Sequence, residues 1–396
     1  MKSSDDLDHL LAAALSGLEQ RHLLRRRRAV RGLDATHVEI DGRRYVNFAS
    51  NNYLGLTHHP RILQAAKEAI ETHGFGSGAA PLVSGYSDLH AAAERAIARW
   101  KGTEDAVLLP SGFQANDAAV GALAAIAESA GRGIRFLLDK LAHASLIDAV
   151  RATGASFRVF PHNGVAKLRR LLQETEPGSL QVVVTESIFS MDGDAADLAS
   201  LAELKREHPF ILLLDEAHGS GVYGPAGAGY AAEIGLRESV DLSVITLSKA
   251  LGGVGGAICA SRQICNAVVN FGRPYLFSTS LPPAVAAAAV AGIEVLRNEP
   301  ERQVRVRALA KRVRAQLLDA GLPIPQGDSP IIPVLRNSEE SALAAAASLR
   351  EQGLLVVAIR PPTVPRGSSR LRVTLSSEHT DLEVDQLLNA LAGLLT

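Results

Sequence analysis

The sequence predicts an α/β protein: a large domain with a mostly parallel seven-stranded sheet flanked by helices, followed by a small α+β domain. Between about residues 90 and 260, short apolar runs alternate with longer stretches of helical spacing. Runs that are apolar on both faces are typical of a buried parallel sheet covered by helices. After about residue 283 this rhythm changes, and a chain of 396 residues is long enough for a second domain.

Seven short apolar runs are the expected strands of the large sheet. They are Ala106–Leu109, Ile134–Leu138, Phe157–Phe160, Val182–Thr185, Ile211–Leu214, Ser243–Thr246 and Ala257–Ala260. Ala- and Leu-rich stretches of helical spacing, such as Val165–Leu172 and Leu198–Lys205, lie between several of them. Parallel strands need long crossover connections, so this order favours a parallel sheet.

The C-terminal region is expected to form the smaller domain. Its expected elements are a long helical stretch at Pro283–Ala320, strands at Ile331–Leu335, Leu354–Ile359 and Leu371–Thr374, and helices at Glu339–Glu351 and Leu382–Leu395. The chain is therefore expected to have three parts. These are an N-terminal helical or extended segment (1–50), a large cofactor-binding domain (51–285) and a small α+β domain (286–396).

Charge and composition exclude several classes of partner. The net charge is −1, so no overall field favours nucleic acid or an anionic membrane. The two cysteines, Cys259 and Cys265, are too few for a disulfide framework or a four-ligand metal site, and no metal is expected. The longest apolar stretch, Leu281–Leu296, contains Glu294 and is shorter than the roughly 20 residues a membrane span needs. Met1–Leu10 lacks the pattern of a secretory signal, and we expect a cytoplasmic protein.

Polar residues follow three of the expected strands where each strand ends. Asp215 comes directly after Ile211–Leu214, and Lys249 lies three residues after Thr246, at the end of another strand. A third strand runs into Ser111-Gly112-Phe113, just before a helical stretch. In open α/β sheets ligands bind at the carboxyl ends of the strands, so these residues are expected to share one site.

Each of these residues suits one part of pyridoxal phosphate (PLP). A buried carboxylate such as Asp215 keeps the pyridine nitrogen protonated, which makes the cofactor an electron sink. Lys249 can form an imine with the aldehyde once its amine is deprotonated. The Ser111-Gly112-Phe113 turn offers backbone N–H groups to the phosphate, and Thr246 adds a hydroxyl. The sequence therefore predicts a PLP enzyme with Lys249 as the Schiff-base lysine.

Taken singly, these features have plainer interpretations. An aspartate at a strand end is often a helix cap, and a lone lysine is usually solvated. Asp215-Glu216-Ala217-His218 also spells a helicase box, but the phosphate-binding loop that such a motor needs is missing from the sequence. Arg25–Arg28 is either a solvated helix face or a contact for an acidic substrate.

Longer motifs resemble one family, the α-oxoamine synthases. These are fold-type I PLP-dependent acyltransferases that join an amino acid to an acyl thioester with loss of CO2. The resemblance runs from about Leu24 to the C-terminus. It rests on the stretches 47–56, Gly76-Ser77-Gly78, Val83-Ser84-Gly85, His143-Ala144-Ser145, 186–194, Asp215–His218, Thr246–Lys249 and Ser278-Thr279-Ser280.

The stretches Ile359–Pro365 and Arg370–Leu375 resemble one branch of this family. That branch condenses L-alanine with a pimeloyl thioester, carried on coenzyme A or on an acyl carrier protein, in biotin biosynthesis. Sister synthases that use glycine or serine are the nearest alternative. An aminotransferase and a nucleotide-driven motor or binding module are more distant ones. The loop Gly78-Ala79-Ala80-Pro81 departs from the Gly-Gly-Ser of many relatives and bears on substrate preference.

The resemblance implies a role for each matching residue. Lys249, Asp215, His143 and His218 would be catalytic, with His143 stacked on the cofactor ring and with His218 and Ser190 near its phenolic oxygen. Ser111, Gly112, Phe113 and Thr246 would face the phosphate, as would Thr279 from the partner subunit of an obligate homodimer with shared active sites. Arg372 would bind the amino-acid carboxylate, a bidentate task suited to arginine. Asn51 and Glu186 would be further substrate-site residues, and Arg25 and Thr363 would contact the acyl substrate.

Overall fold

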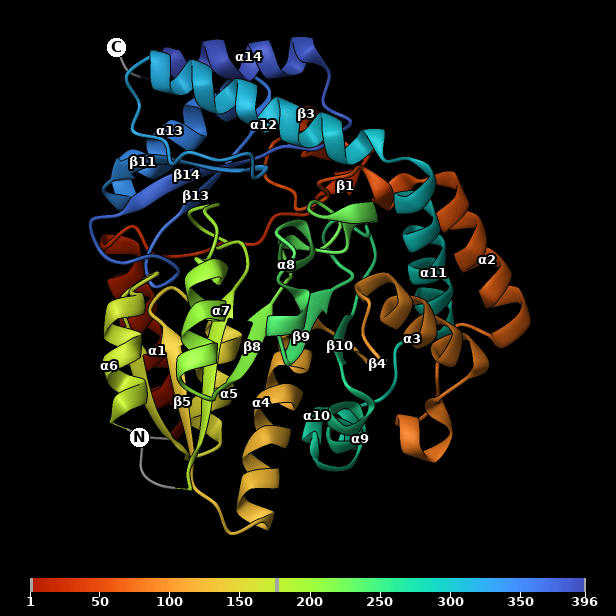
Figure 1. The fold of residues 1–396 in the computed structure, drawn as a ribbon. Helices are drawn as coiled ribbons and strands as arrows, with labels where there is room; N and C mark the ends of the chain where they lie inside the picture. Colours follow the sequence, from red (N-terminus) through yellow and green to blue (C-terminus); the bar gives the residue numbers. More distant parts are fainter. Residues whose placement is uncertain (1–2, 175–177, 395–396) are drawn as a thin grey trace. The chain divides into compact units, whose positions relative to one another are not determined.

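The computed structural model describes residues 3–174 and 178–394 (Figure 1). Contacts divide the chain into a larger unit, residues 51–190 and 194–307, and a smaller unit, residues 1–50, 191–193 and 308–396. The N-terminal segment therefore shares a unit with the C-terminal region. The three-part division with boundaries after residues 50 and 285 stays a prediction.

The larger unit is built on a seven-stranded sheet in the order β4-β10-β9-β8-β7-β5-β6. Its strands are β4 (Asp105–Leu109), β5 (Ile134–Asp139), β6 (Ser156–Phe160), β7 (Leu180–Glu186), β8 (Ile211–Asp215), β9 (Leu242–Thr246) and β10 (Gly256–Ala260). Strands β5 to β9 pair in parallel, whereas β10 runs antiparallel to both β4 and β9. The predicted mostly parallel sheet of seven strands is confirmed, and the predicted α/β fold with it.

Both faces of this sheet are buried, as the uninterrupted apolar runs predicted. Phe136 and Leu138 of β5 pack into one core cluster together with residues of α4 (Gly112–Ser129) and α5 (Ala144–Ala152). Leu137, between them, packs into a second cluster with residues of α6 (Val165–Gln173) and α7 (Leu198–Glu207). Successive side chains of a strand point to opposite faces, so one continuous apolar strand supplies both clusters.

The other helices of the larger unit surround this sheet. They are α2 (Pro60–His73), α3 (Asp88–Lys101), α8 (Tyr230–Glu233), α9 (Arg262–Phe271), α10 (Arg273–Phe277) and α11 (Pro283–Asn298). The single helical stretch predicted at Pro283–Ala320 is instead two helices, because α12 (Glu301–Asp319) begins after Pro300. Proline lacks the N–H that a helix interior requires, so the chain breaks at this residue.

The smaller unit contains α1 (Ser3–Gln20) and two small sheets. The strands β1 (Arg31–Gly32), β2 (His37–Ile40), β3 (Arg43–Asn47) and β12 (Leu354–Leu355) form one, and β11 (Ile331–Asn337), β14 (Ser369–Thr374) and β13 (Val357–Ile359) form the other. Helices α13 (Glu339–Glu351) and α14 (Asp381–Ala392) complete the unit. The strand predicted at Leu354–Ile359 is divided, because β12 pairs with β3 and β13 pairs with β14.

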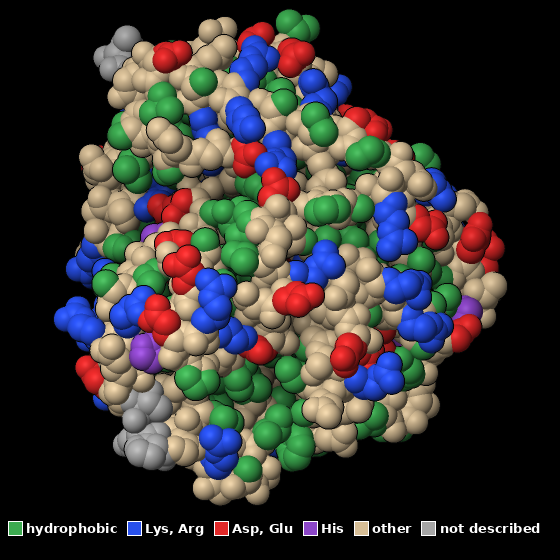
Figure 2. All heavy atoms as spheres, viewed as in Figure 1, with side chains coloured by type: hydrophobic (Ala, Val, Ile, Leu, Met, Phe, Trp, Pro, Cys, Tyr) green, Lys and Arg blue, Asp and Glu red, His purple; other side chains and the backbone are tan. Residues whose placement is uncertain are grey.

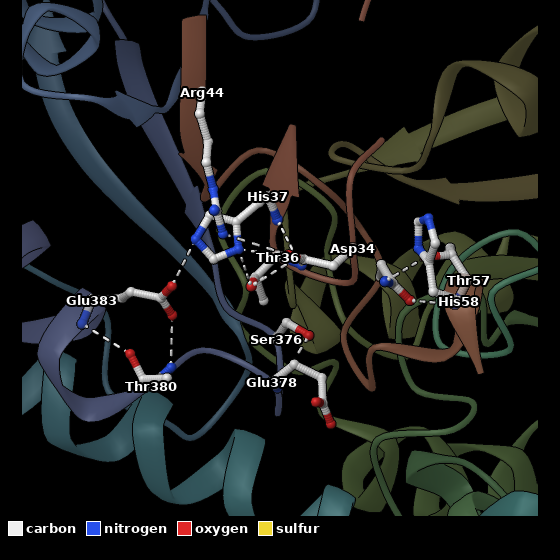
Figure 3. A network of polar contacts seen from close by, with 11 residues as sticks. Asp34, Thr36, His37, Arg44, Thr57, His58, Ser376, Glu378, Thr380 and Glu383 are labelled. Carbon is white, nitrogen blue, oxygen red and sulfur yellow. Dashed lines mark hydrogen bonds and ion pairs between the residues drawn. The ribbon is translucent and has the colours of Figure 1, made fainter. Parts of the chain in front are cut away.

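A histidine in β2 links the N-terminal strands to the last helix (Figure 3). His37 Nδ1 lies 3.0 Å from Asp34 Oδ1, and its Nε2 lies 3.0 Å from Glu383 Oε1. Glu383 also accepts the backbone N–H of Thr380, while the Thr380 hydroxyl accepts the N–H of Glu383. This capping box fixes the start of α14. Residues far apart in the sequence are thus tied into one unit.

The surface mixes charges of both signs, in line with a net charge of −1. On the face drawn in Figure 2, Lys and Arg side chains are interspersed with Asp and Glu side chains. Among the residues that the structure describes, no helix is both long and apolar enough to cross a membrane.

Candidate active site

The carboxyl edge of the large sheet carries most of the predicted site residues. Asp215 is the last residue of β8, Thr246 is the last of β9, and Glu186 is the last of β7. His143 follows β5 and caps α5, and Ser111 follows β4 and caps α4. Adjacent parallel strands end at the same edge, so residues separated by over a hundred positions lie on one edge of the sheet.

Lys249 is half-buried and is held by a histidine. Its Nζ lies 2.8 Å from His218 Nε2, and His218 Nδ1 lies 2.6 Å from the Tyr53 hydroxyl. Tyr53 in turn donates to Asn51 Oδ1 at 3.2 Å. With the hydroxyl proton directed to Asn51, Nδ1 of His218 donates to Tyr53, and Nε2 is left to accept from Lys249. The structure thus brings together three predicted residues, namely Lys249, His218 and Asn51.

A second hydrogen-bond chain joins Asp215 to His143. The amide Nδ2 of Asn116, one turn into α4, donates to Asp215 Oδ2 at 2.8 Å and to Ser145 Oγ at 2.9 Å. Ser145 Oγ lies 2.7 Å from His143 Nδ1, which also accepts the N–H of Ser145. The N–H of Ala217 donates to the other oxygen of Asp215. The carboxylate is therefore fixed at both oxygens.

These contacts define the state of the His143 ring. Burial lowers the pKa of His143 and Lys249 lowers it further, while the charge of Asp215 opposes both effects. The ring is therefore neutral near pH 7. Because Nδ1 accepts the N–H of Ser145, the single ring proton lies on Nε2. His143 can stack on a flat ligand and offer an N–H donor to a carbonyl oxygen.

Glu186 is a fully buried carboxyl group among these residues. Burial raises its pKa well above the usual range, and the charge of Asp215 raises it further, while Lys249 and the backbone N–H groups of His143 and Ser190 oppose the shift. Its Oε1 has no hydrogen-bond partner among the described residues, and neither does the buried Oδ1 of Asn116. Buried polar atoms are rarely left unpaired, so both atoms are suited to a polar ligand.

The start of α4 forms a cradle at the same edge. Ser111 caps the helix by accepting the N–H of Gln114 at 3.1 Å. A Cβ on Gly112 would lie 3.3 Å from the Cβ of Thr246, and a Cβ on Gly256 would lie 2.7 Å from the backbone of Gly112. Glycine is therefore required where β10 passes the helix start. Free backbone N–H groups and the helix dipole make this end of α4 suitable for a phosphate.

Phe113 and Thr279 are both exposed. Next to Thr279, the Ser278 hydroxyl accepts a hydrogen bond from Gln114 Nε2 at 3.2 Å, so this segment lies beside the start of α4 in the same chain. The assignment of Thr279 to a partner subunit's cofactor stays a prediction.

Three predicted substrate contacts belong to the smaller unit. Arg372 is buried in β14 and donates to the Thr374 hydroxyl at 3.1 Å. Arg25 donates to the backbone oxygen of Pro361 at 3.0 Å, and Thr363 is exposed in the turn that follows. Arg25 and Thr363 line one cavity of about 750 Å³.

His162 lies away from the site and holds together two loops that lead to site residues. His162 Nδ1 lies 3.1 Å from Asp139 Oδ1 at the end of β5, and its Nε2 lies 2.7 Å from Asp194 Oδ2. Burial alone would lower the pKa of His162, but the two carboxylates raise it to about 10. Asp139 also accepts the N–H of Leu141, in the loop that leads to His143. The charged His162 thus ties this loop to the hairpin after Glu186.

Sequence reasoning missed Asn116, Tyr53 and Ser145 as site residues. Asn116 carried a signal, because it lies four residues after Gly112, on the same face of a helix that begins at the predicted phosphate turn. Tyr53 and Ser145 lie within motifs that carried the family resemblance, but their partners come from other segments. Among the described residues, no group of three or more His, Cys, Asp or Glu side chains could hold a metal ion.

Comparison with known proteins identifies the class. Residues 43–391 match the family model "Aminotransferase class I and II". A solved structure of a serine palmitoyltransferase (SPT) with a PLP internal aldimine superposes with a TM-score of 0.90 at 30% identity, over 98% of this chain and 97% of that one. The chain therefore belongs to the aminotransferase class I and II family.

Within that family the chain is similar to one group of synthases. It is 44% identical to the 8-amino-7-oxononanoate synthase of Anaeromyxobacter dehalogenans over 385 residues, which cover 97% of this chain and 95% of the relative. The solved structure of the Francisella tularensis 8-amino-7-oxononanoate synthase superposes with a TM-score of 0.76 at 26% identity, over 89% of this chain and 98% of that one. The resemblance to the α-oxoamine synthases is confirmed.

Proposed function

We propose that the protein is a PLP-dependent acyltransferase that condenses L-alanine with a pimeloyl thioester. The products are 8-amino-7-oxononanoate, CO2 and the free thiol of the carrier, and the reaction serves biotin biosynthesis. The observation that carries this proposal is the 44% identity to a synthase of that name over 97% of the chain. The arrangement around Lys249 supports it independently.

The residues at the sheet edge fit PLP. The cradle at Gly112, Thr246 and Gly256 suits the phosphate, and Asp215 is a fixed buried carboxylate for the pyridine nitrogen. The unpaired atoms of Glu186 and Asn116 supply polar groups that a bound molecule would satisfy. When bound, PLP supplies an aldehyde for Lys249 and a ring that withdraws electrons from the amino-acid Cα.

Two residues hold and move protons in the proposed reaction. Asp215 would hold the proton of the pyridine nitrogen of bound PLP, and Asn116 and Ala217 fix its carboxylate by donating one hydrogen bond to each oxygen. The Lys249 amine, once free, takes the Cα proton of L-alanine as general base and returns one at the end. His218, 2.8 Å away, accepts a hydrogen bond from the amine and keeps it in place.

The remaining residues of the sheet edge orient the ring and the substrate. His143 would lie against the ring of bound PLP, and its Nε2 proton would be available to the thioester carbonyl. His218 and Ser190 would be the residues near the phenolic oxygen of bound PLP. Glu186 and Asn51 contact the substrate side of the site. These roles follow the family resemblance, and the hydrogen-bond directions around His143 and His218 support the roles of those two histidines.

The smaller unit supplies the recognition of anionic substrate groups. Arg372 binds the alanine carboxylate, because its planar guanidinium matches a carboxylate at two points. Arg25 and Thr363 contact the acyl substrate. The distal carboxylate of a pimeloyl chain needs donors wherever it leaves water, since an unpaired buried charge is strongly unfavourable.

In this proposal the acyl group is carried on coenzyme A or on an acyl carrier protein. The enzyme is a homodimer and is located in the cytoplasm. Thr279 would contact the cofactor phosphate bound by the partner subunit, and each active site would then need both chains. Phe277 lies two residues before Thr279 in the sequence and Phe113 follows Gly112, and both are exposed, which suits them to a buried contact with a second copy.

A sister synthase that uses serine is the second candidate, favoured by the similarity to the SPT structure. A product assay separates the two. Alanine, glycine and serine are each offered with acyl-CoA substrates of several chain lengths, and the products are identified by mass. The proposal expects alanine and pimeloyl-CoA to give the largest kcat/KM. A preference for serine with a long-chain acyl-CoA would assign the sister function instead.

A further inference from the structure

A short segment between α10 and α11 carries Thr279. The residues on either side of Thr279 are held by other parts of the larger unit. The Ser278 hydroxyl accepts a hydrogen bond from Gln114 Nε2 at 3.2 Å, and the N–H of Ser280 donates to the backbone oxygen of Ala79 at 3.0 Å. Thr279 itself is exposed and makes no hydrogen bond within the described residues. The segment therefore presents an exposed threonine from a fixed base.

Leu281 is a further point at which this segment, residues 278–281, is held. Two side chains donate to the backbone oxygen of Leu281, namely the Ser77 hydroxyl and His90 Nε2, the latter at 2.7 Å. The His90 side chain is buried, with only 3% of the residue exposed, so water does not compete for this hydrogen bond. A carbonyl oxygen has two lone pairs, so both acceptor positions of this oxygen are filled two residues after Thr279.

The direction of the His90 hydrogen bond follows from the other nitrogen of the ring. His90 Nδ1 accepts the backbone N–H of Ser87 at 3.1 Å, so Nδ1 carries no proton. Burial lowers the pKa of His90, while the hydrogen bond to Leu281 and the charge of Asp88 oppose this shift. The ring is neutral near pH 7, and its single proton lies on Nε2, which donates to Leu281.

His90 does more than cap a helix. It lies in the first turn of α3 and forms a capping box with Ser87: its Nδ1 accepts the N–H of Ser87, and its own N–H donates to the Ser87 hydroxyl at 3.4 Å. Glutamate or glutamine usually fills this position of the box. A histidine adds a second ring nitrogen, and here that nitrogen binds a residue 191 positions away in the sequence.

The helix that carries His90 is itself firmly attached to the sheet. α3 packs beside β4 and α11 (Figure 1). One turn after His90, Glu94 accepts the N–H of Leu108 in β4 at 2.8 Å and the Tyr86 hydroxyl at 2.5 Å. β4 leads to the start of α4, where the chain's own phosphate cradle lies. The contact to the segment 278–281 therefore starts from a rigid element of the fold.

We propose that His90 is a positioning residue for the cofactor site of the partner subunit. By donating to Leu281, His90 holds the segment 278–281 in the place from which Thr279 contacts the phosphate bound by the partner subunit. This inference rests on the proposed function, which assigns Thr279 to that phosphate, and adds the residue that places Thr279 there. The PLP affinity of one subunit then depends on the partner subunit's His90.

The test measures how tightly PLP is bound. The holoenzyme is equilibrated by dialysis against a series of PLP concentrations, and the absorption of Lys249-bound PLP gives the dissociation constant. His90→Asn keeps an acceptor in the place of Nδ1 but has no donor that reaches Leu281, whereas His90→Gln keeps a donor in the place of Nε2. Ser87→Ala is the matched control, because it removes the hydroxyl of the capping box and leaves the contact to Leu281 intact.

His90→Asn is expected to raise the dissociation constant of PLP roughly three- to tenfold, the usual size for a hydrogen bond between neutral groups. His90→Gln and Ser87→Ala should bind PLP as wild type does, although Ser87→Ala should lower Tm. In a Thr279→Ala background, which weakens PLP binding by itself, His90→Asn should have no further effect. An equal loss in Ser87→Ala, or a further loss in the Thr279→Ala background, would overturn the proposal.

Heterodimers show which subunit's site His90 serves. In a dimer of one His90→Asn chain and one Lys249→Ala chain, the intact Lys249 belongs to the chain that lacks His90 and receives the segment 278–281 of the chain that keeps it. PLP affinity at this lysine should return to that of wild type. A folding defect would stay with the His90→Asn chain, so stability cannot explain such a recovery. Affinity as weak as in the His90→Asn homodimer, after verified chain exchange, would contradict the proposal.

The same measurements separate this inference from the proposed function. If Thr279→Ala binds PLP as tightly as wild type, the role of Thr279 in the proposed function is wrong, and the inference about His90 is wrong with it. If Thr279→Ala weakens binding and His90→Asn does not, only the inference about His90 is wrong. Product formation from alanine and pimeloyl-CoA by wild type tests the proposed reaction independently of both results.

Discussion

Replacing Asn116 by alanine tests whether Asp215 needs its neighbours to act on the cofactor. The Asn116 amide donates to Asp215 at 2.8 Å and to Ser145 at 2.9 Å, so the change removes two buried hydrogen bonds. A hydrogen bond to a charged group contributes about 1.5–3 kcal/mol. If this hydrogen bond stabilises the transition state of Cα deprotonation and not the ground state, its loss raises the activation free energy by that amount. The rate of Cα deprotonation then falls roughly ten- to a hundredfold.

The assay is exchange of the alanine Cα proton for deuterium in a single turnover, on enzyme saturated with PLP. Asp215→Asn sets the lower limit, because an amide cannot keep the pyridine nitrogen protonated. Asn266→Ala, on the exposed side of α9, is the control. A rate for Asn116→Ala equal to the control would refute the reasoning and make Asn116 a purely structural residue.

Three further outcomes are expected. Mixing inactive Lys249→Ala with an inactive Thr279 variant should restore partial activity after subunit exchange, and a mixture that stays inactive would place Thr279 in its own chain's site. Arg25→Ala and Thr363→Ala should each narrow the difference in kcat/KM between pimeloyl-CoA and uncharged heptanoyl-CoA, whereas an equal loss on both substrates would exclude contact with the tail. Because the pKa of His162 rises from 6.5 to about 10 on folding, its stabilisation is complete below about pH 6.5 and is lost as pH rises to about 10. The Tm difference between wild type and His162→Gln should narrow over that range, and a difference independent of pH would contradict the ion-pair assignment.

The sequence was most informative about the large sheet. Continuous apolar strands such as Val182–Val184 must be buried on both faces, and this alone implies helices on either side. Asp215 and Thr246 are the last residues of two of these strands. Because the strands are parallel neighbours, both residues lie at the carboxyl edge of the sheet. The predicted strands all appear within two residues of their expected ends.

Contacts between segments that are far apart in the sequence could not be predicted in the same way. The two-residue strand β12 is defined by its pairing with β3, and its own sequence is too short to carry a pattern. Asn116 becomes a site residue only because the direction of α4 aims its amide at Asp215. The break at Pro300 was predictable, since proline disrupts a helix interior wherever it occurs.

The central claim is that PLP is held by Lys249, and borohydride reduction followed by peptide mass mapping tests it most directly. The account predicts that the reduced cofactor adds its mass to the peptide containing Lys249. It also predicts that Lys249→Ala loses both this attachment and the formation of product from alanine and pimeloyl-CoA. Attachment at another lysine, or turnover retained by Lys249→Ala, would contradict the account.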